Sequence, residues 1–160
     1  MRIHLDIPGK ASSFHLVLIK PSHYDDDGYV IQWMRSSMPS NSLAAVYGLA
    51  QGCAQRSVLG EATPITVAAY DETNIRIRPD RLARDILAAG GGMVGLVGVQ
   101  SNQYPRAMDL ARRFRALGIN VAIGGFHVSG SLAMLPTMMP ELQEAIDLGI
   151  VLYAATGKRG

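Results

Sequence analysis

The sequence predicts a single α/β domain built around a five-stranded parallel sheet. Its 160 residues are enough for one domain with a substantial core. A hydrophobic content of 48% with only 18% charged residues is typical of a globular chain rather than a disordered one. Short apolar runs alternate with amphipathic segments along the chain, and this alternation indicates β-α-β units with parallel strands.

Five apolar runs are the predicted strands. Each is short and rich in valine, isoleucine or leucine. Because the runs are almost continuously apolar, we expect the strands to be covered on both faces of the sheet. They span residues 16–20, 65–70, 93–99, 119–123 and 150–154.

Four amphipathic segments are the predicted crossover helices. Residues 105–117 show the clearest apolar stripe, with Pro105 at the first helical position and Gly118 as the stop. Right-handed crossovers then give the expected strand order 2-1-3-4-5, a doubly wound, flavodoxin-like sheet. The remaining predicted helices span residues 42–54, 79–89 and 140–148.

Composition argues against several classes of function. The single cysteine, Cys53, excludes an internal disulfide framework and a cysteine-rich zinc site. The net charge of +2 is too small to indicate a nucleic-acid partner, and the four histidines show no metal-ligand spacing. Neither a secretory signal nor a bilayer-spanning apolar run is recognisable, so we expect a cytoplasmic protein with no membrane partner.

The loops after the strands are where a ligand is expected, because open α/β sheets bind ligands at the carboxyl ends of their strands. The most informative loop begins with Gly124 and Gly125, which have no Cβ and would let the backbone approach a ligand closely. The other loop residues are mostly uncharged hydrogen-bonding groups, which suit a large polar ligand. These candidate site residues are Pro21, Ser22 and His23 after the first strand, Asp71 and Glu72 after the second, Gln100, Ser101, Asn102 and Gln103 after the third, Phe126 and His127 after the fourth, and Ala155 after the fifth.

Many of these residues also have a purely structural interpretation. Residues 101–103 suit capping of the helix that starts at Pro105, and both roles can coexist. Residues 71–72 suit capping near the Pro79 helix, and contact with a ligand is the alternative. His127 suits a loop histidine satisfied by the backbone as well as it suits a ligand contact.

Two apolar groups on long connections have two interpretations each. Tyr24, Tyr29 and Trp33 suit either a small cluster within the loop or a face for a ligand or a second domain. Three methionines within residues 134–139 form an irregular apolar patch that suits either burial or an interface.

Motifs for several common activities are missing from the sequence. There is no GxxxxGK[ST] phosphate loop, no GxGxxG after the first strand and no GxSxG elbow. The acidic run at residues 25–27 fits a solvated loop better than a metal site. We therefore expect no catalytic residues of these classes in the chain.

Segments 19–22, 39–51, 71–73, 97–101 and 124–127 together resemble a known family. Their order and their placement at strand ends are similar to the N-terminal cobalamin-binding domain of radical S-adenosylmethionine enzymes. The resemblance covers about residues 14–154. It implies a corrinoid laid over the carboxyl edge of the sheet, with its nucleotide tail in a groove beside the first and fourth strands.

Related cobalamin-binding folds carry the elements DxHxxG, SxL and GG. Gly124 and Gly125 match the glycine pair, and Ser101 matches the serine element in part, because Gln103 stands in place of its leucine. His23 lies in a broken first element, because Pro21 stands in place of the aspartate. Radical S-adenosylmethionine relatives commonly lack a histidine ligand to cobalt, so no residue of this chain is expected to bind the metal.

The CxxxCxxC motif of the radical enzymes is also missing, and one cysteine cannot hold an iron–sulfur cluster. The resemblance therefore implies a cobalamin-binding module with no catalysis of its own. A downstream domain would hold the iron–sulfur cluster and S-adenosylmethionine and perform methyl transfer or related radical chemistry. The alternatives are a flavodoxin-like interaction module without enzyme activity and a flavin or nucleotide binder.

Overall fold

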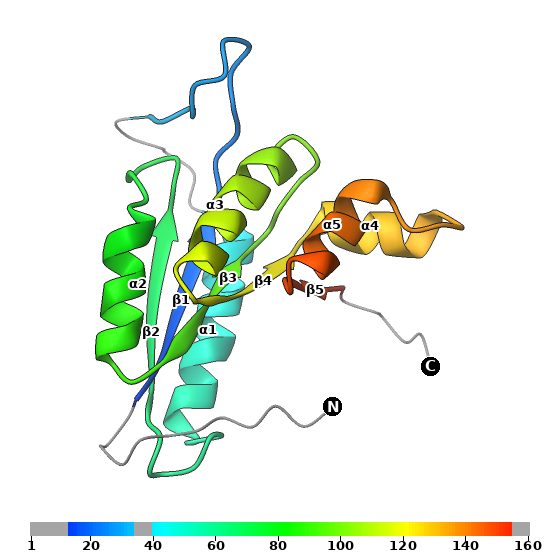
Figure 1. Cartoon of the computed structure of the whole chain (residues 1–160). Coiled ribbons are helices and arrows are strands. Elements are labelled where there is room, and N and C mark those ends of the chain that lie inside the picture. The colour runs from blue at the N-terminus through cyan, green and yellow to red at the C-terminus, as the bar shows by residue number, and fades with distance from the viewer. Residues whose placement is uncertain (1–12, 34–39, 155–160) are drawn as a thin grey trace.

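The computed structural model describes residues 13–33 and 40–154 and confirms the predicted architecture. Five parallel strands form one sheet in the order β2-β1-β3-β4-β5 (Figure 1). The elements are β1 (Phe14–Lys20), α1 (Asn41–Gln55), β2 (Ile65–Asp71), α2 (Pro79–Ala88), β3 (Gly92–Leu96), α3 (Tyr104–Ala116), β4 (Asn120–Gly124), α4 (Phe126–Met134), α5 (Pro140–Asp147) and β5 (Val151–Tyr153).

The helices divide between the two faces of the sheet. Residues of α2, α3 and α5 pack with one set of strand residues in the main core, in which Val17, Phe114 and Leu142 are fully buried. Helix α1 packs on the opposite face against β2 and β1, around a small cluster that includes Leu18 and Ala50 (Figure 1). The alternation of side chains along each parallel strand separates these two clusters.

Local signals explain where the helices begin. The Ser40 hydroxyl accepts a hydrogen bond from the Leu43 amide at 3.2 Å and caps α1. Proline occupies the first turn of α2, α3 and α5. It lacks an N–H, but the N–H groups of a first turn have no partner within the helix, so no helical hydrogen bond is lost. The predicted helices at residues 79–89, 105–117 and 140–148 are therefore confirmed to within a residue or two.

Two predicted elements differ from the structure. Residues 126–129 were expected to belong to the loop after the fourth strand, but residues 126–134 form α4. The apolar residues of α4 make no stripe, and Val128 is its one fully buried residue. The third strand ends at Leu96 instead of Val99, because Gly98 adopts a φ of +65° and bends the chain. The crossover from β4 to β5 consequently contains two helices.

The long connection after β1 is an ordered arm in its described part, residues 21–33. It rises from the carboxyl end of β1 above the sheet (Figure 1). The Asp25 carboxylate accepts hydrogen bonds from the amides of Asp27 and Tyr29, and an antiparallel bridge joins Tyr24 to Val30. Asp25 therefore closes a hairpin turn, as a short polar side chain does in many turns.

Candidate functional site

An apolar groove with a volume of about 620 Å³ lies on the α1 face of the sheet. Its wall is α1, which contributes Ala45, Val46 and Leu49. Its floor is the outward face of β1, β3 and β4, where Leu18 pairs with Gly95 and Gly95 pairs with Ala122 across the strands. Two of these three floor residues, Gly95 and Ala122, are small, so little side-chain volume fills the floor over β3 and β4.

The carboxyl end of the groove carries its polar groups. Ser42 at the start of α1 and Ser129 in α4 both line it, and so do Gly98, Gly124 and Gly125. The expectation that the glycine pair borders a ligand-sized space is consistent with this placement. Both glycines lie at the sheet edge where ligands bind in open α/β folds.

The two glycines nevertheless differ in what surrounds them. Gly125 has a φ of +146°, and a Cβ there would lie 2.2 Å from the Val99 nitrogen, so its bare backbone is needed for close packing within the chain. A Cβ at Gly124 would meet Tyr153 at ordinary contact distances of 3.4 Å and more. The loop after β3 therefore requires the bare backbone of Gly125, and ligand contact at either glycine stays a prediction.

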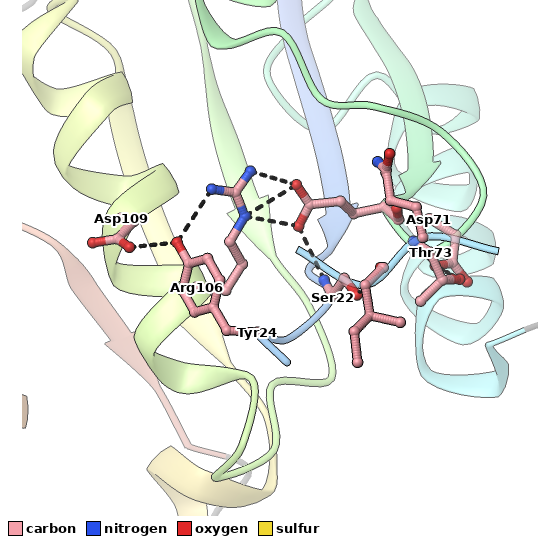
Figure 2. Close-up of polar contacts among 9 residues, drawn as sticks. Ser22, Tyr24, Asp71, Thr73, Arg106 and Asp109 are labelled. Carbon is pink, nitrogen blue, oxygen red and sulfur yellow. Dashed lines mark hydrogen bonds and ion pairs between the residues drawn. The ribbon is translucent and has the colours of Figure 1, made fainter. Parts of the chain in front are cut away.

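A buried ion pair joins the first two strand-end loops to α3. Glu72 is 1% exposed, and its carboxylate accepts hydrogen bonds from the Arg106 guanidinium, the shortest being 2.6 Å. The Ser22 amide donates to the same carboxylate at 3.0 Å (Figure 2). Pairing and hydrogen bonds of this kind are what make a buried carboxylate tolerable.

The ion pair continues outward through Tyr24. Its hydroxyl lies 2.5 Å from the Asp109 carboxylate and accepts from Arg106 at 3.4 Å (Figure 2). Burial and the hydrogen bond to Asp109 raise the pKa of Tyr24. Burial opposes the charge of Arg106, but hydrogen bonds to Glu72 and Tyr24 outweigh it and raise the pKa of Arg106. The arm is thus held on α3 by a charged network.

This network changes the interpretation of the acidic strand-end pair. Glu72 was a candidate for ligand contact or helix capping, but both of its oxygens are engaged by Arg106 and Ser22, so we leave it out of the binding site. Asp71 does not cap the Pro79 helix either, because its carboxylate accepts from the amide and hydroxyl of Thr73 (Figure 2).

A second polar cluster lies on the far side of the sheet edge. His127 Nδ1 is 3.1 Å from the Ser101 hydroxyl. The His127 ring also packs against the ring of Tyr104, with the two centroids 4.3 Å apart and the ring planes tilted by 34°. His127 Nε2 is buried and has no hydrogen-bond partner among the described residues. Burial lowers the pKa of His127, which favours the neutral ring, although nearby Glu141 opposes this shift.

A hydrogen bond within the loop after β3 joins Gln100 and Gln103. The Gln103 side-chain oxygen accepts a hydrogen bond from the Gln100 amide at 3.0 Å, and Gln103 is 7% exposed. No side chain caps α3 at Gln103, so the expected capping by residues 101–103 is wrong. The loop residues instead hold the loop and His127 in place.

The predicted site residues therefore fall into separate groups. Gly124 and Gly125 line the groove, Ser101 and His127 form the second cluster, and Ser22 is buried under the arm. Ala155 lies outside the described residues. The remaining candidates do not line the groove. Asp71 ends β2, Phe126 begins α4 and is 70% exposed, and the others lie in the strand-end loops: Pro21, His23, Glu72, Gln100, Asn102 and Gln103.

Sequence reasoning missed most of the groove. Its lining includes Gly95 and Ala122, which were read only as interior strand residues. A signal was present, since Gly95, Ala122 and Gly124 occupy outward positions of β3 and β4 and are all small. It also missed Arg106, which pairs with Glu72 across 34 residues of sequence.

The structure separates the members of the two apolar groups, the aromatic residues of the arm and the methionines of residues 134–139. Tyr24 joins the charged network, whereas Tyr29 and Trp33 are 73% and 63% exposed and do not form a buried loop cluster. The methionines divide as well, since Met139 packs on the core and Met134 is 78% exposed. The described part of the arm thus presents aromatic surface to solvent.

The described residues contain no group of three or more side chains that could hold a metal ion. None of the described helices has the length and apolarity to cross a bilayer. Comparison of the chain with protein-family models, with curated proteins and with solved structures gives no match.

Proposed function

We propose that this chain is a corrinoid-binding module and that the groove beside α1 receives the nucleotide tail of cobalamin. The observation that carries the proposal is the apolar groove of about 620 Å³ that opens at the carboxyl edge of the sheet. Its volume lies within the range of about 300–1,000 Å³ that is usual for sites of organic ligands. The strand order also agrees with the fold that the family resemblance implies.

The lining of the groove fits a flat heteroaromatic group joined to a polar chain. Gly95 and Ala122 leave room over the floor, while Leu18 and Val46 provide apolar contact on either side. At the open end, the hydroxyls of Ser42 and Ser129 are available for the ribose and phosphate of the tail. A macrocycle would then lie above the carboxyl ends of β1, β3 and β4.

In this proposal the chain holds and orients the cofactor. When bound, the corrinoid supplies cobalt for methyl transfer or a related reaction. The single cysteine leaves an iron–sulfur cluster and S-adenosylmethionine to a downstream domain, which we propose as the partner of this module. His127 is not proposed as a cobalt ligand, because its Nδ1 faces Ser101 and its other ring nitrogen, Nε2, is buried.

The test is retention of hydroxocobalamin by the purified chain, measured as the visible spectrum of the protein peak after gel filtration. Ala122→Leu should fill the floor of the groove and weaken binding by about tenfold or more, because a buried subsite is lost. Ala88→Leu makes the same change on the exposed surface of α2 and should leave binding unaltered.

Two outcomes would contradict the proposal. One is a wild-type chain that retains no corrinoid, and the other is equal binding by the Ala122→Leu and wild-type chains. Gly125→Val is a poor test of the same idea, because its side chain would collide with the Val99 backbone and disturb the fold itself.

A second function is favoured by one observation. Val151 and Tyr153 on the groove side of β5 are 61% and 67% exposed. Apolar surface next to a groove is typical of a protein interface as well as of a ligand site. An interaction module would bind a protein partner on this face and would leave hydroxocobalamin in the small-molecule fraction.

A further inference from the structure

The arginines of the described residues divide into two groups. Five of them bond to acceptors within the chain, namely Arg56, Arg106, Arg112, Arg113 and Arg115. The side chains of Arg76, Arg78, Arg81 and Arg84 are exposed and have no hydrogen-bond or ion-pair partner in the part of the chain that the structure describes. All four belong to one segment that enters α2.

Two buried side chains anchor this arginine segment to the main core. Ile77 lies between Arg76 and Arg78 and is 6% exposed, so it anchors the segment to the main core. Leu82 is 7% exposed and does the same for the first turn of α2. The guanidiniums line two adjoining hollows of about 470 Å³ each. The positive charge is thus displayed on a fixed surface.

The position of these charges is electrostatically unfavourable for the chain alone. Arg81 and Arg84 lie three residues apart on α2, which makes these like charges neighbours on the helix surface, and Arg78 directly precedes the helix. Arg78 and Arg81 also lie at the amino end of α2, where the helix dipole is positive and disfavours cations. An anionic partner would relieve both repulsions.

The surroundings of the arginines favour a protein over a phosphate chain. Asp85 lines one of the hollows with Arg81, and a free carboxylate there would repel a phosphate but suits a protein with mixed charges. Ile75 and Leu87 are 48% and 59% exposed in the same segment and helix. Guanidiniums mixed with exposed apolar groups are typical of protein interfaces.

The arm extends this surface at its other end. Arg76 also lines a hollow shared with Tyr29 and Val30, and Tyr29 is 73% exposed. The Trp33 amide donates to the Thr73 carbonyl at 2.7 Å, which places the base of the arm alongside the start of the arginine segment. Tyrosine, tryptophan and arginine are the residues that dominate binding energy in interfaces.

We infer that the arginine segment and the adjoining arm form a docking surface for an acidic segment of a partner protein that also carries apolar side chains. The partner's carboxylates would pair with Arg76, Arg78, Arg81 and Arg84, and its apolar residues would contact Ile75 and Tyr29. This surface is separate from the groove, so the inference does not depend on corrinoid binding.

The probe is a fluorescein-labelled synthetic peptide of glutamates with interspersed leucines and phenylalanines, titrated with the full chain and followed by anisotropy. Binding should weaken between about 50 mM and about 300 mM NaCl, as expected for screened charges. The double variant R81E/R84E should weaken binding by about tenfold or more, because repulsion replaces attraction. Circular dichroism of each variant checks that the fold is kept.

The matched control is R56E, which reverses one exposed charge far from α2 and should change the affinity by less than about twofold. The inference is overturned if the peptide does not bind or if R81E/R84E binds it as well as the wild-type chain. Single-stranded oligothymidylate is titrated in parallel. Tighter binding of that oligonucleotide than of the peptide would also overturn the inference, because it would assign the surface to nucleic acid.

Discussion

The two faces of the sheet differ in how the chain covers them. On one face α2, α3 and α5 form a continuous core in which Phe114, Ile86 and Leu142 are completely buried. On the other face α1 packs on β2 and β1 around a small cluster, and a groove of about 620 Å³ remains beside it. Stability is therefore concentrated on the first face, and space for a ligand or partner lies on the second.

The difference between the two faces arises from the size of the side chains that β3 and β4 present to each of them. Toward the covered face, β3 and β4 present Val94, Leu96, Val121 and Ile123, which are large and buried. Toward the groove, the same strands present small residues such as Gly95 and Ala122. Close packing needs large groups, so the small ones leave space that a ligand or partner can fill.

The largest expected effect comes from truncating the core of the covered face. Phe114→Ala should lower the free energy of unfolding by about 3–5 kcal/mol, because it removes a fully buried ring and leaves a cavity. Leu16→Ala on the groove face should cost only about 1 kcal/mol, because Leu16 is partly buried and borders open space. Urea unfolding followed by circular dichroism measures both, and equal losses would remove the distinction between the faces.

An intermediate effect is expected at the edge of the covered face. Glu72→Gln should cost about 3 kcal/mol, because it leaves Arg106 part-buried without its counter-ion. Asp80→Asn removes the charge from a solvent-exposed pair with Arg113, whose side chains are 59% and 54% exposed, and should cost less than about 1 kcal/mol. If urea unfolding gives the same loss for both variants, the buried pair does not hold the arm on α3.

The smallest effect is a dependence on pH. Burial lowers the pKa of His127 in the folded chain. The stability that depends on its neutral ring is therefore fully present above the ordinary histidine pKa of about 6.5. This stability is lost as the pH falls from there through the lowered pKa of the folded chain. The loss should be well under about 1 kcal/mol, because solvent screens the part-exposed ring.

The measurement is the difference in unfolding free energy between wild type and His127→Gln at pH 7.5 and pH 5, both chosen to bracket a pKa of about 6.5. The fall in stability between the two should be smaller in the variant. A variant that loses as much stability as the wild type would show that His127 is not the titrating group.

The elements with strong local signals were predictable. Residues 105–117 carry an apolar stripe between Pro105 and Gly118, and the structure has α3 there. Residues 126–134 have no such stripe, since exposed Phe126 and Met134 lie on either side of buried Val128, and α4 was missed. Periodicity predicts a helix only where one side of it is apolar.

The candidate site was less predictable, because its contacts join distant parts of the chain. Gly124 and Gly125 were identified as a pair, but their difference depends on Val99 and Tyr153, which the fold brings beside them. For Glu72 the sequence left ligand contact and helix capping open, and the structure shows an ion pair with Arg106 of α3 instead.

The order of the strands follows from the alternation of strands and helices along the sequence together with the right-handed crossover. It could be predicted because periodicity and turn residues act over a few neighbours in the chain. The groove on one face, the packing of Gly125 against backbone and the pairing of Arg106 with Glu72 arise only in the folded chain. Those outcomes depend on side chains that are far apart in sequence and meet only after the sheet has formed.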